Sequence, residues 1–518
     1  MAPEYLSPGV YVEEVDKGTK PIEGAGTACA AFLGFAEQGP TNQPTFIPNW
    51  TQFVTTFGGF VKGGFLANAV FGYFMNGGGR CYVTRLPGGD GQAELKAAVA
   101  LPSRSKKSIE SLDVTALEAG PSGADVTVEV ANPSGADAPE DQFNLVIRSG
   151  TTEEVFENLS FGKGKGIRNV LDVVNKQSKL VRIAVKESSL SGVDLIPNPG
   201  KYSLVITKET STALANISSG EIVGDASERT GLSGFEVTDD VTMVCIPDLM
   251  ALYQAGTISM DGVKAVQLAV IAHCEKMKDR FAVLDCPPGL KPQAMKDWRM
   301  NVAGYDTKYG AVYYPWIKVA DPSGESEGII VPPSGYMAGI YARNDNERGV
   351  HKAPANEVVR GAMALEMQIT KGEQDILNPI GVNCIRSFPG RGIRVWGART
   401  LSSDASWRYI NVRRLFNFVE KSIENGTQWI VFEPNDADLW ARIRRDISAF
   451  LSTVWSSGAL FGATASQAFY VKCDEELNTP AVRDLGQVRI EIGMAPVKPA
   501  EFVIFRISQW AAGSETSE

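Results

Sequence analysis

The sequence predicts a multidomain protein of the α/β (α+β) class, in which mixed sheets and helices flank a mainly β insertion. The chain has 518 residues, a length that favours about three or four domains over one compact core. Apolar strand-like runs alternate with helix-like runs toward both ends of the chain. Between them, residues 92–240 hold short alternating segments separated by turns rich in Pro, Gly, Ser and Asp, as in a β domain.

The composition is that of an ordinary globular protein, with 44% hydrophobic and 21% charged residues. A net charge of -10 argues against a general nucleic-acid-binding protein, because such proteins need a basic surface. The N-terminus shows no secretory signal, and no apolar run approaches the roughly 20 residues that span a bilayer. We therefore expect synthesis in the cytoplasm, no nucleic-acid partner and no direct membrane insertion.

Cysteine and histidine usage argues against metal, redox and nucleophilic chemistry. His273 and His351 are the only histidines, too few and too far apart in sequence for a histidine-rich metal site or a nucleophile–base pair. The seven cysteines form no C-x-x-C pair, so we expect buried, reduced thiols. They are Cys29, Cys81, Cys245, Cys274, Cys286, Cys384 and Cys473. The sequence predicts no catalytic residue, no metal ligand and no cofactor.

The first 91 residues contain a terminal arm and the start of a core domain. Residues 10–15 are β-prone but have no hairpin partner, so this strand either pairs at an edge of its own fold or is donated to another subunit. The order strand 27–36, helix 65–75 and strand 81–85 is typical of a βαβ unit. Gly77-Gly78-Gly79 follows this helix instead of opening one, which favours a tight turn over a phosphate-binding loop.

Beyond the insertion, the chain returns to alternating strands and helices. Residues 242–246 and 281–284 are predicted strands, with a helix at 263–278. Asp285 follows the second strand, a position where catalytic carboxylates often lie. Because no P-loop and no second positioned acid accompany it, we interpret Asp285 as a turn-capping residue.

Residues 383–431 are the densest structural signal: a glycine-punctuated strand, a loop, a helix at 409–425 and a strand at 429–433. A second helix is predicted at 436–457, with Asp436 as its N-cap. In the first helix the apolar side is Ile410, Leu415, Phe416, Val419 and Ile423, and Arg413, Arg414 and Lys421 are expected to be more exposed. In the second helix Arg442, Arg444 and Arg445 lie largely outside the apolar stripe.

Three long motifs carry a resemblance to a known family. They are VPPSGYMAGIYAR at residues 331–343, RGVHKAPAN at 348–356 and PGRGIRVWGART at 389–400. Together with PGVY at 8–11 and the FLG to GP segment at 32–40, they resemble the tail sheath family of contractile phage tails and related contractile injection systems. The C-terminal half shares the resemblance, whereas the β insertion does so only loosely.

The resemblance implies a sheath-type core and a mechanical function. Such a subunit forms hexameric rings stacked around an inner tube and contracts from a metastable extended state, driving the tube through a target membrane without nucleotide hydrolysis. The implied partners are other copies of the chain, the inner tube protein, and baseplate and tail-terminator or cap proteins. The implied location is a phage tail or phage tail-like particle, which is assembled in the cytoplasm and can be released from the cell.

The resemblance also implies roles for both termini and for one helix. In sheaths the terminal strands complete a small sheet in the C-terminal domains of neighbouring subunits, so residues 16–18 and 495–500 would be linkers. We hypothesise that the helix at 436–457 attaches to the tube, with Arg442 and Arg445 facing it. The exchanged strands would be Val10, Tyr11, Val12, Glu13 and Val15 in the N-terminal arm, and Phe502, Val503, Ile504, Phe505 and Ile507 in the C-terminal arm.

Two other function classes compete with the sheath. An α/β enzyme of unknown activity lacks G-x-S-x-G, P-loop and H-E-x-x-H motifs, and a surface-binding protein would need binding residues on the insertion that the sequence does not identify. The predicted organisation is an arm (1–20), a first core part (21–91), the inserted mainly β domain (92–240), a second core part (241–380), a C-terminal sheath domain with exchanged strand (381–510) and a polar tail (511–518).

Overall fold

The computed structural model describes residues 21–87, 96–104, 109–119, 125–133, 139, 141–150, 152–162, 164, 167–185, 192–205, 217–322, 324 and 326–506. The predicted N-terminal arm at 1–20, Ile507 and the polar tail lie outside these residues. The chain divides into two compact units, each treated by itself below. The core unit consists of residues 1–87 and 214–518, and the inserted unit of residues 88–213.

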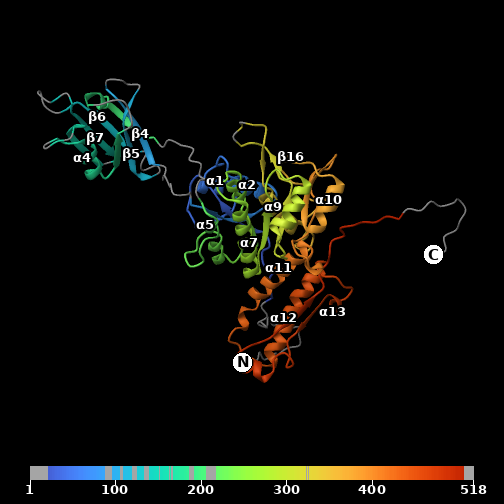
Figure 1. Cartoon of the computed structure of the whole chain (residues 1–518). Coiled ribbons are helices and arrows are strands. Elements are labelled where there is room, and N and C mark those ends of the chain that lie inside the picture. The colour runs from blue at the N-terminus through green and yellow to red at the C-terminus, as the bar shows by residue number, and fades with distance from the viewer. Residues whose placement is uncertain are drawn as a thin grey trace, which may run out of the picture. The chain divides into compact units, whose positions relative to one another are not determined.

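Figure 1 shows the core unit with helices α7 (Met260–Met277) and α9 (Ser334–Arg348) labelled. An eight-stranded sheet lies at the centre of this unit, in the order β18-β17-β13-β12-β11-β1-β3-β2. The six inner strands run parallel, and the edge strands β2 and β18 are antiparallel to their neighbours. β1, β11, β12 and β13 are buried throughout, which explains their continuous apolar sequences. The strands are β1 (Cys29–Gly34), β2 (Thr45–Ile47), β3 (Arg80–Arg85), β11 (Met243–Cys245), β12 (Phe281–Asp285), β13 (Gly310–Tyr314), β17 (Val382–Phe388) and β18 (Gly392–Val395).

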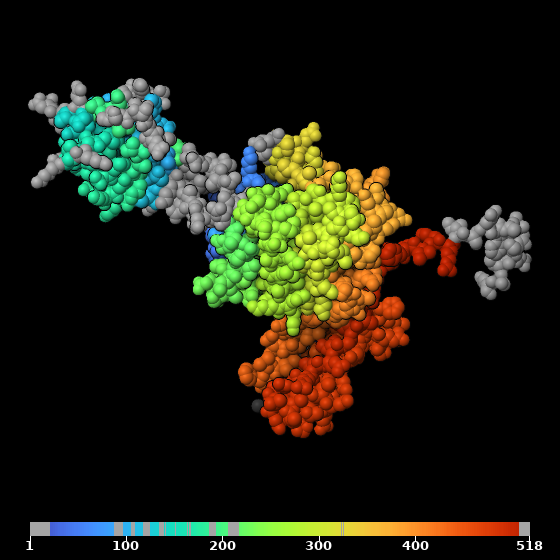
Figure 2. All heavy atoms as spheres, in the orientation of Figure 1, coloured from blue at the N-terminus to red at the C-terminus, as the bar shows by residue number. Residues whose placement is uncertain are grey.

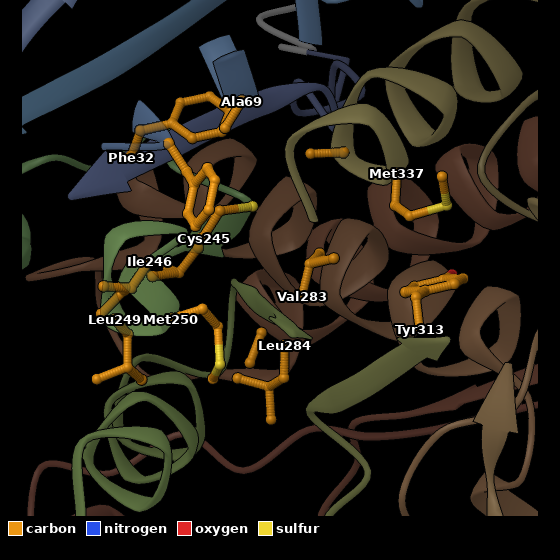
Figure 3. Packing of buried hydrophobic residues seen from close by; sticks show 14 of the residues in the cluster. Phe32, Ala69, Cys245, Ile246, Leu249, Met250, Val283, Leu284, Tyr313 and Met337 are labelled. Atoms are coloured by element: carbon orange, nitrogen blue, oxygen red, sulfur yellow. The ribbon is translucent and has the colours of Figure 1, made fainter. Parts of the chain in front are cut away.

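Helices cover this sheet and complete a single apolar core. Figure 3 shows Phe32 of β1, Cys245 of β11 and Met337 of α9 within the same buried layer. A small sheet, in the order β15-β14-β16, adds to the same unit. The elements are α1 (Trp50–Phe57), α2 (Leu66–Met75), α5 (Ser219–Val223), α6 (Asp248–Gln254), α7 (Met260–Met277), α8 (Pro292–Asp297), α9 (Ser334–Arg348), α10 (Lys371–Leu377), β14 (Ile317–Val319), β15 (Ile329–Val331) and β16 (Ala362–Leu365).

Helices α2 and α9 pack unusually close together. A Cβ atom on Gly335 would lie inside van der Waals contact of the Ala69 backbone, and one on Gly339 would do the same at the Tyr73 carbonyl. The two glycines are four residues apart and therefore lie on one face of α9. The absence of side chains on that face is what allows the two backbones to approach.

Two buried carboxylates cap helices of this core. Asp285, at the end of β12, accepts hydrogen bonds from the Ser334 amide (2.9 Å) and hydroxyl (2.5 Å) at the start of α9. Asp248 accepts hydrogen bonds from the amides of Phe35 (2.6 Å), Leu66 (3.1 Å) and Phe65 around the start of α2. Asp285 is therefore not the local turn cap that the sequence predicted. It caps a helix that begins 49 residues later in the chain.

The described residues of the inserted unit form two antiparallel sheets, one α-helix and a short 3-10 helix (Gly192–Leu195) around their own apolar core. Its composition of alternating short strands agrees with the sequence prediction. Residues 217–240, which the sequence analysis assigned to the insertion, instead contribute Ile222 and Phe235 to the core unit. The sheets have the orders β10-β6-β7-β8 and β4-β5-β9. The elements are β4 (Lys96–Pro102), β5 (Glu110–Ala119), β6 (Thr127–Ala131), β7 (Phe143–Ser149), β8 (Thr152–Leu159), α4 (Val170–Gln177), β9 (Val181–Val185) and β10 (Gly200–Ser203).

The C-terminal part of the core unit consists mainly of two long helices and a two-stranded sheet. The predicted N-cap is confirmed, because the Asp436 carboxylate accepts a hydrogen bond from the Leu439 amide (2.8 Å). The predicted strand at 429–433 is wrong. This apolar run forms a short 3-10 turn between α11 and α12, where it has no neighbouring strand to pair with. The elements are α11 (Ile410–Gly426), α12 (Ala437–Ser456), α13 (Ala465–Ala468), β19 (Phe469–Lys472), α14 (Pro480–Asp484) and β20 (Glu491–Met494).

Arg413 and Arg414 are buried, contrary to the exposed positions predicted for them. Both ends of the Arg414 guanidinium donate to Asp345 of α9 (2.9 and 2.7 Å), and one also donates to the Thr27 carbonyl (2.9 Å). Arg413 donates to Asn417 (2.7 Å) and stacks over the Trp407 ring. Helical periodicity alone does not distinguish a solvated arginine from one whose donors are satisfied by tertiary partners.

The close approach of α2 and α9 gives a first prediction. We expect Gly335→Ala to lower the free energy of unfolding by about 1–3 kcal/mol, because the added methyl group must push the two backbones apart. Gly372→Ala in α10 is the matched control, since a Cβ there meets open space. It should raise stability by about 0.5–1 kcal/mol. Urea denaturation of both variants checks this, and equal effects would contradict the packing argument.

The buried Asp285 gives a second prediction, which concerns pH. Burial, partly offset by the hydrogen bonds from Ser334, raises the pKa of Asp285 to about 7. The folded chain therefore holds this proton after the unfolded chain has lost it, so the stabilisation is present below the ordinary pKa of 3.8 and disappears as the pH rises through 7. Between pH 5 and pH 8 this group should lower the free energy of unfolding by up to about 3 kcal/mol.

Asp285→Asn removes this titration while keeping an acceptor for the Ser334 amide. Urea denaturation at pH 5 and pH 8 should show a smaller pH dependence for the variant than for the wild type. Asp248, whose pKa burial raises to about 6, is present in both proteins and cancels in the comparison. Identical pH dependence in the two proteins would refute the assignment.

Candidate assembly surfaces

No cluster of metal-binding groups occurs among the residues that the structure describes. Groups of three or more His, Cys, Asp or Glu side chains with metal-site geometry are absent from this part of the chain. All seven cysteines are free and buried, as predicted. His273 is buried against Arg280 (3.1 Å), and burial lowers its pKa to about 4. Within the described residues, no helix has the length and apolar character to cross a membrane.

The surfaces that stand out are those of the C-terminal part, residues 409–506. Its helices α11 and α12 share a third apolar cluster, separate from the central core. Five of the six large aromatic side chains that are exposed among the described residues lie here. They are Phe432, Phe461, Tyr470, Phe502 and Phe505. Exposed aromatic groups concentrated in one part of a molecule are typical of interaction surfaces.

Helix α12 buries an apolar stripe and exposes two of its three arginines. Arg442 donates to Glu433 (3.2 Å) and lies over the Trp429 ring, with 45% of its side chain exposed. Arg445 donates to Asp446 (3.0 Å) and is 54% exposed. Arg444 turns inward and donates to the Cys473 carbonyl. Exposed ion pairs of this kind are weak, so the two outer arginines are free to exchange partners.

A two-stranded antiparallel sheet lies next to α12. β19 and β20 pair from Phe469 opposite Met494 to Lys472 opposite Glu491. Among the described residues no third strand pairs with either of them. Their inner side chains pack on the third apolar cluster, while Tyr470 on the other face is 53% exposed. An isolated pair of strands is marginal in water, and its free edges can accept further strands.

The C-terminal arm is extended and uncovered as far as the structure describes it. Phe502, Val503, Ile504 and Phe505 are exposed by 71%, 69%, 81% and 82%. Residues 501–506 belong to no helix or strand, and Figure 2 shows this red segment uncovered on the visible face. Four consecutive apolar side chains in water are a large departure from the usual burial of such residues.

Residues 495–497, the first half of the linker that the resemblance implied at 495–500, are held by hydrogen bonds. Ala495 exchanges hydrogen bonds with the 461–468 segment, through its own amide to Ala468 (2.8 Å) and its carbonyl from Phe461 (2.7 Å). Val497 donates to the Ala459 carbonyl (3.2 Å) and accepts from the Asn411 amide group (3.2 Å). Prolines at either side indicated a break in regular structure, but tertiary partners fix the path of the chain through Val497.

The arm then passes Glu501, a residue that sequence reasoning missed. Its carboxylate accepts hydrogen bonds from Arg399, Asn378 and Tyr409. Burial raises the pKa of Glu501, but these hydrogen bonds and the Arg399 charge outweigh it and hold the pKa below its usual value. Arg399 lies 102 residues away in the chain, so no local sequence pattern reveals the pair.

The segment that follows the N-terminal arm also packs against the C-terminal part. Ile22 packs in the third apolar cluster with Leu415 and Val419 of α11. The Ala25 amide donates to the Ser422 hydroxyl (2.9 Å). The arm residues Val10, Tyr11, Val12, Glu13 and Val15 themselves lie outside the described residues, as does Ile507. The described chain next to each arm is thus attached to the C-terminal part.

Two protein-family models match this chain. A phage tail sheath protein central domain matches residues 247–401, and a phage tail sheath C-terminal domain matches residues 402–509. The two matches are adjacent and together cover more than half of the chain.

Relatives and solved structures agree with these matches. The tail sheath protein of Vibrio phage KVP40 is 28% identical over 192 residues, which are 36% of this chain and 28% of that protein. The tail sheath protein of Escherichia phage P2 is 24% identical over 64% of this chain and 83% of that protein. The contracted helical sheath of the anti-feeding prophage is 25% identical with a TM-score of 0.58, covering 97% of this chain and 99% of that one.

A contracted sheath of an extracellular contractile injection system, PVC, shares the fold at 24% identity and a TM-score of 0.58, over 98% of this chain and 99% of that one. The chain thus spans only about a quarter of the Vibrio phage protein but nearly all of the injection-system sheaths. The mixed α/β layers, the inserted unit and the C-terminal helices all fall within these structural matches. On these grounds, the chain belongs to the phage tail sheath protein family.

Proposed function

We propose that this chain is the structural subunit of a contractile sheath, which polymerises as stacked hexameric rings around an inner tube. The observation that carries the proposal is that one chain has both a segment that can be donated as a strand and a sheet edge that can accept one. The uncovered apolar segment 502–505 would be the donor strand, and the free edges of β19 and β20 would be the acceptors. Because donor and acceptor are different surfaces, each copy binds the next head to tail, which generates rings or helical lattices.

Strand exchange suits a lattice that must move without breaking. Main-chain hydrogen bonds between a donated strand and a sheet edge do not depend on the orientation of the rest of the donor subunit. Each apolar side chain that the donated strand buries adds about 1.5–3 kcal/mol. Val10, Tyr11, Val12, Glu13 and Val15 would form the corresponding N-terminal strand, and Phe502, Val503, Ile504, Phe505 and Ile507 the C-terminal one.

Contraction would run downhill from a kinetically trapped extended lattice and drive the inner tube through a target membrane. It requires no nucleotide, because new contact between subunits can supply the energy. About 400 Å² of additional apolar burial per subunit corresponds to at most roughly 10 kcal/mol. The baseplate and a tail-terminator or cap protein would bound the sheath at its two ends, in a phage tail or phage tail-like particle.

A structural role fits the described residues better than the alternatives. An enzyme would need free, convergent polar groups in a pocket, whereas in the pocket beside α11 the cations Arg414 and Lys421 are already paired with Asp345 and Asp279. A surface-binding function of the inserted unit has no specific observation in its favour. We therefore propose a structural subunit rather than an enzyme.

Removal of the N-terminal arm tests the exchange model. We expect a variant lacking residues 1–17 to fold but not to polymerise, because the contacts of Ile22 and Ala25 with α11 are retained. Electron microscopy should show hollow striated tubes for the wild type and single particles for the truncated chain. A variant lacking only the polar tail 511–518 is the control and should assemble. Normal contractile tubes from the arm deletion would refute the model.

Charge reversal on α12 tests the tube-facing assignment. Arg442→Glu with Arg445→Glu should weaken binding of the inner tube at least tenfold and reduce its salt dependence, because exposed charges steer and orient association. Lys62→Glu with Lys371→Glu makes the same change of charge at exposed sites elsewhere in the core unit. Co-sedimentation with preformed tubes measures the difference. Equal binding by the two double variants would remove α12 as the tube contact.

A further inference from the structure

The root of the C-terminal arm is held by a carboxylate with four hydrogen bonds. Glu501 Oε1 accepts from Arg399 Nε (2.9 Å) and Asn378 Nδ2 (2.7 Å), and Oε2 accepts from Arg399 Nη2 (2.6 Å) and Tyr409 Oη (3.0 Å). The Arg399 and Glu501 side chains are only 10% and 18% exposed. A two-pronged arginine–carboxylate pair shielded from water is among the stronger polar contacts in proteins.

The donors of this clamp, Asn378, Arg399 and Tyr409, are themselves fixed to the core unit. Asn378 follows α10, and Tyr409 is the N-cap of α11. Asn383 of β17 holds Arg399 from both sides, accepting from its amide (2.7 Å) and donating to its carbonyl (2.8 Å). The arm is therefore attached at Glu501 to groups that other residues of the core unit hold in place.

Glu501 and Phe502 are adjacent in the chain but lie in different environments. Glu501 is held, whereas Phe502 and the residues after it are mostly exposed. The boundary between fixed and free chain consequently lies between these two residues. The linker that the resemblance implied, at 495–500, would place this boundary several residues earlier.

We propose that Glu501 is the fixed point of the C-terminal arm and thereby limits how far the arm reaches into a second copy of the chain. This inference rests on the strand exchange proposed above. The phage tail sheath C-terminal domain matches the chain up to residue 509, so we take residues 502–509 as the donated segment. As a strand, these eight residues extend by about 3.3 Å each, or roughly 26 Å in all. The β19–β20 edge that receives the arm must then lie within about 30 Å of the donor's Glu501, in the extended sheath and in the contracted one.

Release of the clamp would change this limit by a known amount. Without Glu501 the last fixed point is Val497, which keeps its hydrogen bonds to Ala459 and Asn411. The tether grows from about eight to about 12 residues and its reach by about 13 Å. Because effective concentration falls as the −3/2 power of tether length, each exchange becomes about twofold less favourable.

Two variants test the fixed point by opposite routes. Glu501→Gln removes the charge and opens the clamp, whereas insertion of Gly-Ser-Gly-Ser after Glu501 lengthens the free chain and leaves the clamp closed. Both should raise the critical protein concentration for sheath assembly about twofold. In urea denaturation of the unassembled protein, only Glu501→Gln should lower the free energy of unfolding, because the insertion leaves the four hydrogen bonds of the Glu501 carboxylate intact. A purely structural role for Glu501 would not make the insertion variant assemble poorly.

Glu475→Gln, at an exposed glutamate of the same part of the chain, is the matched control and should assemble like the wild type. Deletion of residues 502–518 separates this inference from the proposed function. Normal assembly of that deletion would overturn strand exchange itself. Loss of assembly in the deletion, combined with wild-type behaviour of both Glu501→Gln and the insertion, would overturn only the fixed point. A cryo-electron microscopy map with a donor Glu501 more than about 30 Å from every receiving edge would also overturn it.

Discussion

The buried ion pair between Arg414 and Asp345 is the contact on which the arrangement of the core unit depends. Arg414 belongs to α11 in the C-terminal part, and Asp345 belongs to α9 over the central sheet. The same guanidinium binds the Thr27 carbonyl just before β1 and lies over the Tyr341 ring. The Arg414 guanidinium therefore connects the segment before β1, the helix α9 over the sheet and the C-terminal helices. Loss of either partner would leave a buried charge unpaired, at a cost of about 3–5 kcal/mol.

This rigid junction contrasts with the segments through which copies of the chain would interact. Burial and satisfied hydrogen bonds hold the body together up to Glu501, and the exposed apolar segment begins immediately after it. The proposed contacts are of two physical kinds. Donated strands provide main-chain hydrogen bonds that tolerate rotation, and the exposed arginines of α12 provide weak charge pairs that can exchange. A subunit that moves as a rigid body while remaining linked to its neighbours requires both properties.

Sequence reasoning succeeded where local signals decide the structure. The buried strands β1 and β12, the helix α12 with its Asp436 cap and the burial of the cysteines were all predicted, because apolar periodicity and capping act over a few residues. It failed at 429–433, where an apolar run has no strand beside it, and at Arg413 and Arg414, whose partners make burial favourable. A tertiary partner reversed the local expectation in each case.

The sequence by itself determined the fold class and the membership of the sheath family, since alternating segments and long motifs are written directly in the order of residues. Only the tertiary structure showed that Asp285 caps α9, that residues 495–497 are tied down and that Glu501 meets Arg399. These contacts join residues that are tens to a hundred positions apart in the chain. Their existence depends on how the sheet and helices bring distant segments together, which no local pattern of residues records.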